Sequence, residues 1–240
     1  MIKAIILDLD DTLIDTTEQL TEPWEEMLVL VLSEQTGRTL REIKSILKRF
    51  KKTNMPTNKL TLAFCEHFGI NYNAVKEEVS RRISLSSLKL SYDAKRFLRS
   101  MGPYKIFLIT TGSKILQERK LQHLGLVGHF TVFFDESDGN KTVFMKKILG
   151  KYSSEELICI GDNIKNEITA ANSLNISTIR VLKGKRKDLR PEKKDETPTW
   201  TVHTLQEALK IIETQQRVYL HKTALSSRKP TPSRRIPTVR

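Results

Sequence analysis

Five short apolar runs, separated by segments with helical patterning, constrain the fold of this 240-residue chain more than any other feature. Each run is four to six residues long and apolar almost throughout. Strands of this kind are typical of parallel sheets that helices cover on both faces. The runs occupy residues 2–7, 106–109, 131–134, 157–160 and 178–182. Their alternation with helices predicts an α/β fold built on a doubly wound, Rossmann-like parallel sheet.

Helical patterns fill the intervals between these runs, as a doubly wound sheet requires. They cover residues 113–124, 142–149 and 166–174, and a closing helical pattern at residues 205–212 follows the last run. Gly125 and Gly150 directly follow the first two patterns, and glycine after an apolar periodic segment is a common helix stop. Residues 200–202 have the composition of a short final strand.

The interval between the first two strands is far too long for a simple crossover. It contains four further helical patterns before a helix at residues 92–101 returns the chain to the sheet. These patterns cover residues 23–32, 40–50, 60–68 and 75–83. We therefore predict a core formed by residues 1–14 and 89–213, with a helical cap of residues 15–88 inserted after the first strand.

The net charge of +13 is concentrated at one end of the chain. Residues 214–240 contain no Asp or Glu and seven basic residues, which are Arg217, Lys222, Arg228, Lys229, Arg234, Arg235 and Arg240. A Ser-, Thr-, Pro- and Arg-rich segment cannot bury a core, so we predict that this tail is disordered. Its charge could support weak contacts with nucleic acid or an acidic partner.

The rest of the composition is that of a globular protein, with 38% hydrophobic and 29% charged residues. No apolar run reaches the roughly 18 residues that a membrane span needs, and the apolar start leads into acidic residues without a cleavage site. We expect a cytoplasmic protein that makes no membrane contact. Cys65 and Cys159 are far apart in apolar surroundings, which predicts reduced, buried thiols.

The first strand ends in the acidic segment Asp8-Leu9-Asp10-Asp11-Thr12. A carboxylate directly after a buried strand is costly unless an ion or a function compensates its charge. Asp8 and Asp10 can converge if the chain bends after the strand, and their hard oxygens suit Mg2+. One carboxylate could then attack phosphorus while the other transfers the proton of the leaving group. A carboxylate-rich turn that caps the next helix is the alternative interpretation.

Three later strands also end in residues suited to phosphate chemistry, and the carboxyl ends of parallel strands meet at one sheet edge. The second strand leads into Thr110-Thr111-Gly112, whose hydroxyl and backbone amides suit phosphate oxygens. Lys141 follows the third strand at a helix start, where a cation opposes the macrodipole unless it faces an anion. The fourth strand ends in Gly161-Asp162, and Glu167 lies on the next turn. Together with the acidic segment, these groups compose a phosphoryl-transfer site.

This ordered set of motifs resembles that of the haloacid dehalogenase (HAD) superfamily. Asp8-Leu9-Asp10-Asp11-Thr12 matches the first family motif, DxDxT, while Thr110 and Lys141 match the second and third. Gly161-Asp162 matches the start of the fourth motif, GDxxxxD, and Glu167 stands in the place of its last aspartate. The resemblance covers residues 1–213 and implies that the helical insertion is a cap of the C1 type.

The resemblance also implies a mechanism, a cofactor and a substrate class. Asp8 would be the nucleophile that forms an aspartyl-phosphate, and Asp10 would protonate the leaving oxygen and then activate water. The phosphoryl oxygens would be bound by Thr110, Thr111, Gly112 and Lys141. Mg2+ would be bound by Asp8, the main-chain carbonyl of Asp10 and Asp162, with Glu167 reaching its water shell. The substrate would be a small phosphorylated metabolite such as a sugar phosphate, phosphoglycolate or a nucleotide.

Two alternatives stay open at this point. The chain could have lost catalysis and serve as a binding protein, as Glu167 and the basic tail would allow. It could also be a phosphatase tethered to nucleic acid by the tail and the basic residues 183–190. The complete set of acidic and basic residues at the strand ends favours an active enzyme. No aromatic stacking platform accompanies the basic segments, which makes specific nucleic-acid recognition the weaker interpretation.

Overall fold

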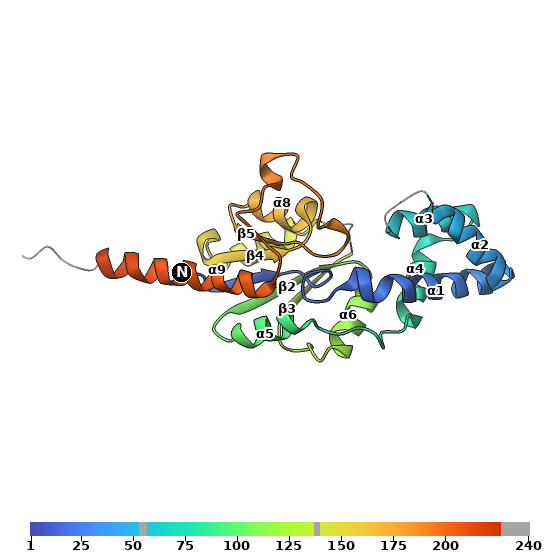
Figure 1. The fold of residues 1–240 in the computed structure, drawn as a ribbon, viewed down its shortest axis with the longest axis horizontal. Helices are drawn as coiled ribbons and strands as arrows, with labels where there is room; N and C mark the ends of the chain where they lie inside the picture. Colours follow the sequence, from blue (N-terminus) through green and yellow to red (C-terminus); the bar gives the residue numbers. More distant parts are fainter. Residues whose placement is uncertain (53–56, 137–139, 227–240) are drawn as a thin grey trace, which may run out of the picture.

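The computed structural model describes residues 1–52, 57–136 and 140–226, and at its centre lies a six-stranded parallel sheet (Figure 1). The strands are β1 (Ala4–Leu7), β2 (Lys105–Thr111), β3 (Thr131–Asp135), β4 (Leu157–Gly161), β5 (Ser177–Val181) and β6 (Trp200–Val202). Their spatial order is β3-β2-β1-β4-β5-β6, and every neighbouring pair is parallel. The predicted α/β fold with a doubly wound parallel sheet is therefore confirmed.

Alternate residues of the central strand β1 point to opposite faces of the sheet and enter two separate apolar clusters. The core helices are α5 (Tyr92–Ser100), α6 (Lys114–His123), α7 (Thr142–Leu149), α8 (Thr169–Asn172) and α9 (Leu205–Ser226). Ile5 and Leu7 pack in the cluster that includes residues of α5, α6 and α9. Ala4 and Ile6 pack in the cluster that includes residues of α7 and α8. Burial on both faces explains why the sequence of β1 is continuously apolar.

Four helices between β1 and α5 pack on an apolar cluster of their own. They are α1 (Thr16–Thr36), α2 (Leu40–Lys51), α3 (Thr57–His67) and α4 (Tyr72–Arg82). Leu32, Phe64 and Val79 are fully buried in this cluster, whose buried residues are distinct from those on the two faces of the sheet. Figure 1 shows the four helices at one end of the sheet. The assignment of residues 15–88 to a separate cap domain stays a prediction.

Helix α1 begins at Thr16, ahead of the predicted start at residue 23. Asp11, which has a φ of 56°, accepts a hydrogen bond of 2.8 Å from the backbone N–H of Thr17. This bond satisfies one of the free donors in the first turn of the helix. Pro23 consequently lies inside α1 and not at its start.

Helix α9 extends well past its predicted end and continues through Ser226. The composition of the tail predicts disorder from residue 214, but residues 214–226 are helical. The side chain of Gln216 accepts from the Ile2 backbone N–H and donates to the Ile2 carbonyl oxygen, both at 2.9 Å. These two bonds attach the extension to the chain ahead of β1 and explain its order. The rest of the predicted tail, residues 227–240, lies outside the described residues.

Both cysteines are free and buried, as predicted. Cys65 belongs to the apolar cluster of α1–α4, and Cys159 lies in β4. Within the part of the chain that the structure describes, we find no helix long and apolar enough to cross a membrane.

Candidate active site

Lys141 brings two of the predicted acidic residues together at the carboxyl edge of the sheet. Its Nζ lies 2.6 Å from Oδ1 of Asp8 and 2.5 Å from Oε1 of Glu167, and the residue is only 1% exposed. Lys141 immediately precedes α7, so these carboxylates offset the unfavourable position of a cation at a helix start. Burial by itself would lower the pKa of Lys141, but the charges and hydrogen bonds of Asp8 and Glu167 outweigh it and raise the pKa.

Asp8 is the buried carboxylate that directly follows β1. Lys141 holds its Oδ1, and the hydroxyl of Thr12 donates to its Oδ2 at 3.2 Å. Burial raises the pKa of Asp8 to about 7; Lys141 opposes this rise, while the charges of Glu167 and Asp10 add to it. Both oxygens are thus held in place in a charged environment, as an attacking carboxylate requires.

Glu167 uses both of its carboxylate oxygens within the protein. Oε1 contacts Lys141, and Oε2 accepts from the backbone N–H of Asn163 at 3.0 Å. Glu167 lies in a π-helical turn, Ile164–Ile168, which replaces the start of the predicted helix and is a type of turn often found at functional sites. A Cβ on Gly161 would lie 2.7 Å from Cγ of Glu167. The glycine at the end of β4 therefore makes room for the longer acidic side chain.

Asp162 directly follows β4 and is also buried. Burial raises the pKa of Asp162 to about 8; the charges of Glu167 and Asp8 add to this rise, and Arg186 opposes it. Nη1 of Arg186 lies 3.5 Å from Oδ2 of Asp162. Arg186 belongs to the basic segment 183–190, which the sequence indicated only as a run of charge.

The buried guanidinium of Arg180 in β5 fixes this basic loop beside Asp162. It donates to the carbonyl oxygens of Asp162 at 3.2 Å, Arg186 at 2.6 Å and Leu189 at 2.9 Å. Gly184, in the same loop, lies directly against the acidic segment. A Cβ added to this glycine would lie 2.2 Å from Oδ2 of Asp11. The loop after β5 is thus held against the site by backbone contacts.

The side chain of Asp10 contacts partners on α6 and α1. Nζ of Lys120 lies 2.6 Å from Oδ1, Nε2 of Gln117 donates to Oδ2 at 2.8 Å, and the hydroxyl of Thr16 also donates to Oδ1. Burial would raise the pKa of Asp10, but the charge of Lys120 and the hydrogen bonds of Lys120, Thr16 and Gln117 lower it. Lys120 and Gln117 were not predicted as site residues, because such side chains in a short helix usually face solvent.

The capping interpretation of the acidic segment holds for Asp11, while the catalytic and metal-binding roles of Asp8 and Asp10 stay predictions. Asp11 caps α1, since its Oδ1 accepts from the backbone of Thr17 and its Oδ2 accepts from the Thr17 hydroxyl at 2.6 Å. Asp8 and Asp10 instead face buried lysines at the sheet edge.

The predicted phosphate-binding residues at the end of β2 differ in what they can offer. Thr110 is fully buried, and among the described residues none hydrogen-bonds to its hydroxyl, which suits a phosphate oxygen. Gly112 donates its N–H to the carbonyl oxygen of Asp135 at 3.0 Å, so this predicted donor is already engaged. The hydroxyl of Thr111 accepts from Asn166 at 3.4 Å.

The chemistry of the acidic residues fits a divalent cation. Asp8, Asp162 and Glu167 supply hard carboxylate oxygens, and their mutual repulsion contributes to the raised pKa values of Asp8 and Asp162. A bound cation would relieve this repulsion. No three Asp, Glu, His or Cys side chains in the described ranges are arranged to hold a metal ion by themselves. Asp8 and Asp162 directly follow the neighbouring strands β1 and β4, so they are the side chains that fit the cation best.

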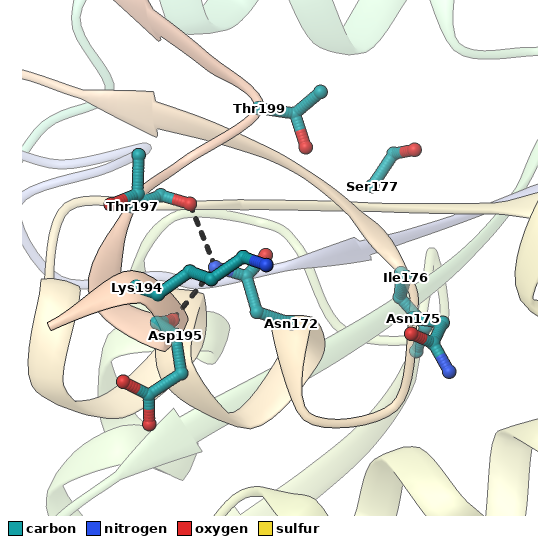
Figure 2. A pocket seen from close by; sticks show the side chains of 8 residues that line it. All are labelled: Asn172, Asn175, Ile176, Ser177, Lys194, Asp195, Thr197 and Thr199. Atoms are coloured by element: carbon teal, nitrogen blue, oxygen red, sulfur yellow. Dashed lines mark hydrogen bonds between the residues drawn. The ribbon is translucent and has the colours of Figure 1, made fainter.

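A pocket of about 620 Å³ lies at the opposite end of the sheet (Figure 2). Its lining is mostly amide and hydroxyl groups, from Asn172, Asn175, Ile176, Ser177, Lys194, Asp195, Thr197 and Thr199. The side chain of Asn172 donates to the carbonyl oxygens of Asp195 at 2.7 Å and Thr197 at 2.8 Å. Ser177 begins β5, so this pocket lies at the amino ends of the strands and is separate from the acidic cluster.

The site has a buried carboxylate after β1, a lysine that contacts it, and a threonine hydroxyl at the end of β2 that has no partner among the described residues. These are groups that a hydrolase of the phosphoryl-transfer type would use. Residues 2–175 match the haloacid dehalogenase-like hydrolase family. The chain belongs to this family.

Two phosphatases align with nearly the whole chain. The glyceraldehyde 3-phosphate phosphatase of Methanocaldococcus jannaschii is 27% identical over 232 residues, which are 89% of this chain and 98% of the relative. The enzyme of the same name from Methanopyrus kandleri is 25% identical over 239 residues, 88% of this chain and 97% of the relative. The predicted class, a HAD-like phosphoric monoester hydrolase, is thereby confirmed.

A solved structure supports the fold. The HAD hydrolase YfnB of Bacillus subtilis, whose structure contains magnesium, has a TM-score of 0.60 and 17% identity, covering 88% of this chain and 98% of that one. At this identity the likeness concerns the fold alone.

Proposed function

We propose that this protein is a Mg2+-dependent phosphatase that hydrolyses a small sugar phosphate of the triose phosphate type through an aspartyl-phosphate on Asp8. The observation that carries the proposal is the buried contact of Lys141 with Asp8, because it puts an anion-binding cation beside a fixed carboxylate. The names of the two phosphatase relatives support the substrate class. Phosphoglycolate and nucleotides are the competing substrates.

The phosphoryl group would bind between the strand ends. Lys141 and the hydroxyl of Thr110 would contact its oxygens, while Asp8 faces the phosphorus atom. Asp8, Asp162 and the main-chain carbonyl of Asp10 would hold Mg2+. The bound ion would screen the charge of Asp8 and of the phosphate, which otherwise repel each other. Glu167 holds Lys141 from the other side, a role that does not require it to bind the ion directly.

The reaction would take place in two steps. In the first, a carboxylate oxygen of Asp8 forms a bond to phosphorus, the bond to the leaving oxygen breaks, and Asp10 gives that oxygen a proton. In the second, a water molecule attacks phosphorus and loses its proton to Asp10, and the bond between phosphorus and Asp8 breaks. Inorganic phosphate leaves, and Asp8 and Asp10 return to their original states.

The alternative of a catalytically silent binding protein has little support. Glu167 differs from the aspartate of the family motif, but Gly161 leaves room for its longer side chain, and its carboxylate contacts Lys141. The alternative of a phosphatase tethered to nucleic acid rests on the basic tail, of which residues 227–240 lie outside the described part of the chain.

The test is phosphate release from glyceraldehyde 3-phosphate, phosphoglycolate, a nucleoside monophosphate and p-nitrophenyl phosphate, with and without EDTA. We expect activity that needs Mg2+ and falls by at least about 10³-fold in Asp8→Asn. Asp188→Asn, a change of the same kind in the exposed loop, serves as the control and should retain full activity. Activity that survives in Asp8→Asn would overturn the mechanism, and a preference for another substrate would overturn the proposed class.

A further inference from the structure

We propose that Lys120 and Gln117 of α6 are positioning residues that hold the carboxylate of Asp10 in the orientation from which it exchanges protons with the leaving group and with water. The proposal rests on the proposed function, in which Asp10 is the acid and the base. Neither residue belongs to the four family motifs at the strand ends, and neither would touch the substrate.

The geometry accounts for both oxygens of Asp10. Lys120 lies 2.6 Å from Oδ1, and Gln117 donates to Oδ2 at 2.8 Å. The two residues are three positions apart in one helix and so share a face. Thr16, at the start of α1, also donates to Oδ1. A carboxylate with both oxygens bound in this way has little freedom to rotate.

The side-chain amide of Gln117 also connects Asp10 to the end of β2. The same Nε2 donates to the carbonyl oxygen of Thr111 at 3.0 Å. Since both neighbours of this nitrogen are acceptors, a flipped amide would put oxygen against oxygen and is excluded. Gln117 therefore fixes the distance between the proposed acid and the strand that carries Thr110.

The burial of Lys120 is hard to explain by stability alone. Its side chain is 3% exposed and lies on the helix face that also carries the buried Leu116 and Leu121. Apolar replacement of a buried ion pair is often neutral or stabilising, so a fold has no need for a charge at this position. Lys114, on the same helix, has the ordinary position of a lysine: its side chain is 52% exposed and lies 3.7 Å from Glu118.

The test compares wild type, Lys120→Met and Gln117→Met, with Lys114→Met as the matched surface control. Each variant is assayed with glyceraldehyde 3-phosphate, whose alkoxide leaving group needs a proton, and with p-nitrophenyl phosphate, whose leaving group is a stable anion. We expect kcat/KM for glyceraldehyde 3-phosphate to fall by about 10²-fold in both α6 variants, chiefly through kcat. The loss with p-nitrophenyl phosphate should be less than about tenfold, and Lys114→Met should match wild type.

The two substrates separate positioning from a merely structural role. A folding defect lowers the amount of active enzyme and reduces both activities equally, so equal losses would overturn the proposal, as would full activity in Lys120→Met. Gln117→Met removes two hydrogen bonds but no charge, and it provides the same comparison if Lys120→Met does not fold. If wild type hydrolyses neither substrate, the proposed function fails first, and this inference fails with it.

Discussion

The carboxyl edge of the sheet and the interior of the predicted cap, which is the apolar cluster of α1–α4, bury side chains of opposite character. At the edge, Asp8, Lys141 and Glu167 are at most 6% exposed and are held by ion pairs. In the cap, Phe64 is fully buried, and its ring lies 5.5 Å from that of Phe50 and 5.3 Å from that of Phe68. Apolar burial stabilises a fold directly, whereas buried charge costs free energy unless its partners compensate. We infer that the edge is organised for chemistry and the cap interior for folding.

Lys141→Met should have the largest effect, because it removes the cation that two buried carboxylates share. We expect a loss of about 3–5 kcal/mol in the free energy of unfolding and of about 10²–10³ in kcat. Lys146→Met, an exposed lysine in the same helix, is the control. The sharper comparison adds Glu167→Gln to Lys141→Met, which should restore much of the stability and none of the activity. If activity returned with stability, the distinction between the edge and the cap would fail.

Phe64→Ala tests the other side of the comparison. Truncating this fully buried ring should cost about 3–5 kcal/mol in the free energy of unfolding, measured with urea. The kcat for p-nitrophenyl phosphate per folded molecule should change little, because no group at the sheet edge is altered. Leu62→Ala, a truncation of an exposed residue in the same helix, should cost far less. A large fall in kcat would show that packing in the cap also sets the geometry of the edge.

The sequence predicted those parts of the structure that depend on local patterns. β1, β2 and β4 were found because burial on both faces leaves continuous apolar runs, and Asp8, Lys141 and Asp162 were found because each follows a strand. The early start of α1 and the extension of α9 were missed. The start of α1 depends on the left-handed backbone of Asp11, which lets its carboxylate accept from Thr17. The extension of α9 depends on a contact with a distant part of the chain, which joins Gln216 to Ile2.

The same limit applies to the site. Lys120 looks like a surface lysine in its helix, and only the tertiary fold turns it toward Asp10. Glu167 was identified, but its contact with Lys141 depends on a π-helical turn that periodicity does not reveal. For α1–α4 the sequence predicts packing and not function, because apolar spacing indicates only which face of each helix is buried.

Gly161→Ala should have an intermediate effect on both stability and kcat, because it changes the packing around Glu167 at the site. The added Cβ would lie 2.7 Å from Cγ and 3.0 Å from Cβ of Glu167, so the acidic side chain must shift. We expect a loss of about 1–3 kcal/mol in the free energy of unfolding and a fall of about tenfold in kcat. Gly102→Ala, at a glycine with open space around it, is the control. Adding Glu167→Asp to Gly161→Ala should relieve the clash and restore stability. If the double variant is no more stable than Gly161→Ala, the glycine has another role.

The smallest effect concerns the pH dependence of the metal-free protein. Burial raises the pKa of Asp8 to about 7 and that of Asp162 to about 8, so the folded state binds these protons more tightly than the unfolded state. Their contribution to stability is complete below the ordinary carboxyl pKa and is lost as the pH rises through about 7 to 8. The Tm in EDTA should therefore fall as the pH rises from about 5 to about 8 and level off above that, on the order of 2–4 °C per kcal/mol lost.

Asp162→Asn removes one of these groups and should flatten the dependence, while Mg2+ should flatten it in wild type by compensating both charges. The cap offers the matched contrast, because its interior is apolar and its free Cys65 has a pKa that burial raises to about 11, above this range. Phe64→Ala should lower the Tm by the same amount at every pH and leave its slope unchanged. The opposite result is a slope of Tm against pH that changes in Phe64→Ala but not in Asp162→Asn. It would place the pH-sensitive charge outside the carboxyl edge of the sheet and contradict the division of roles between the two regions.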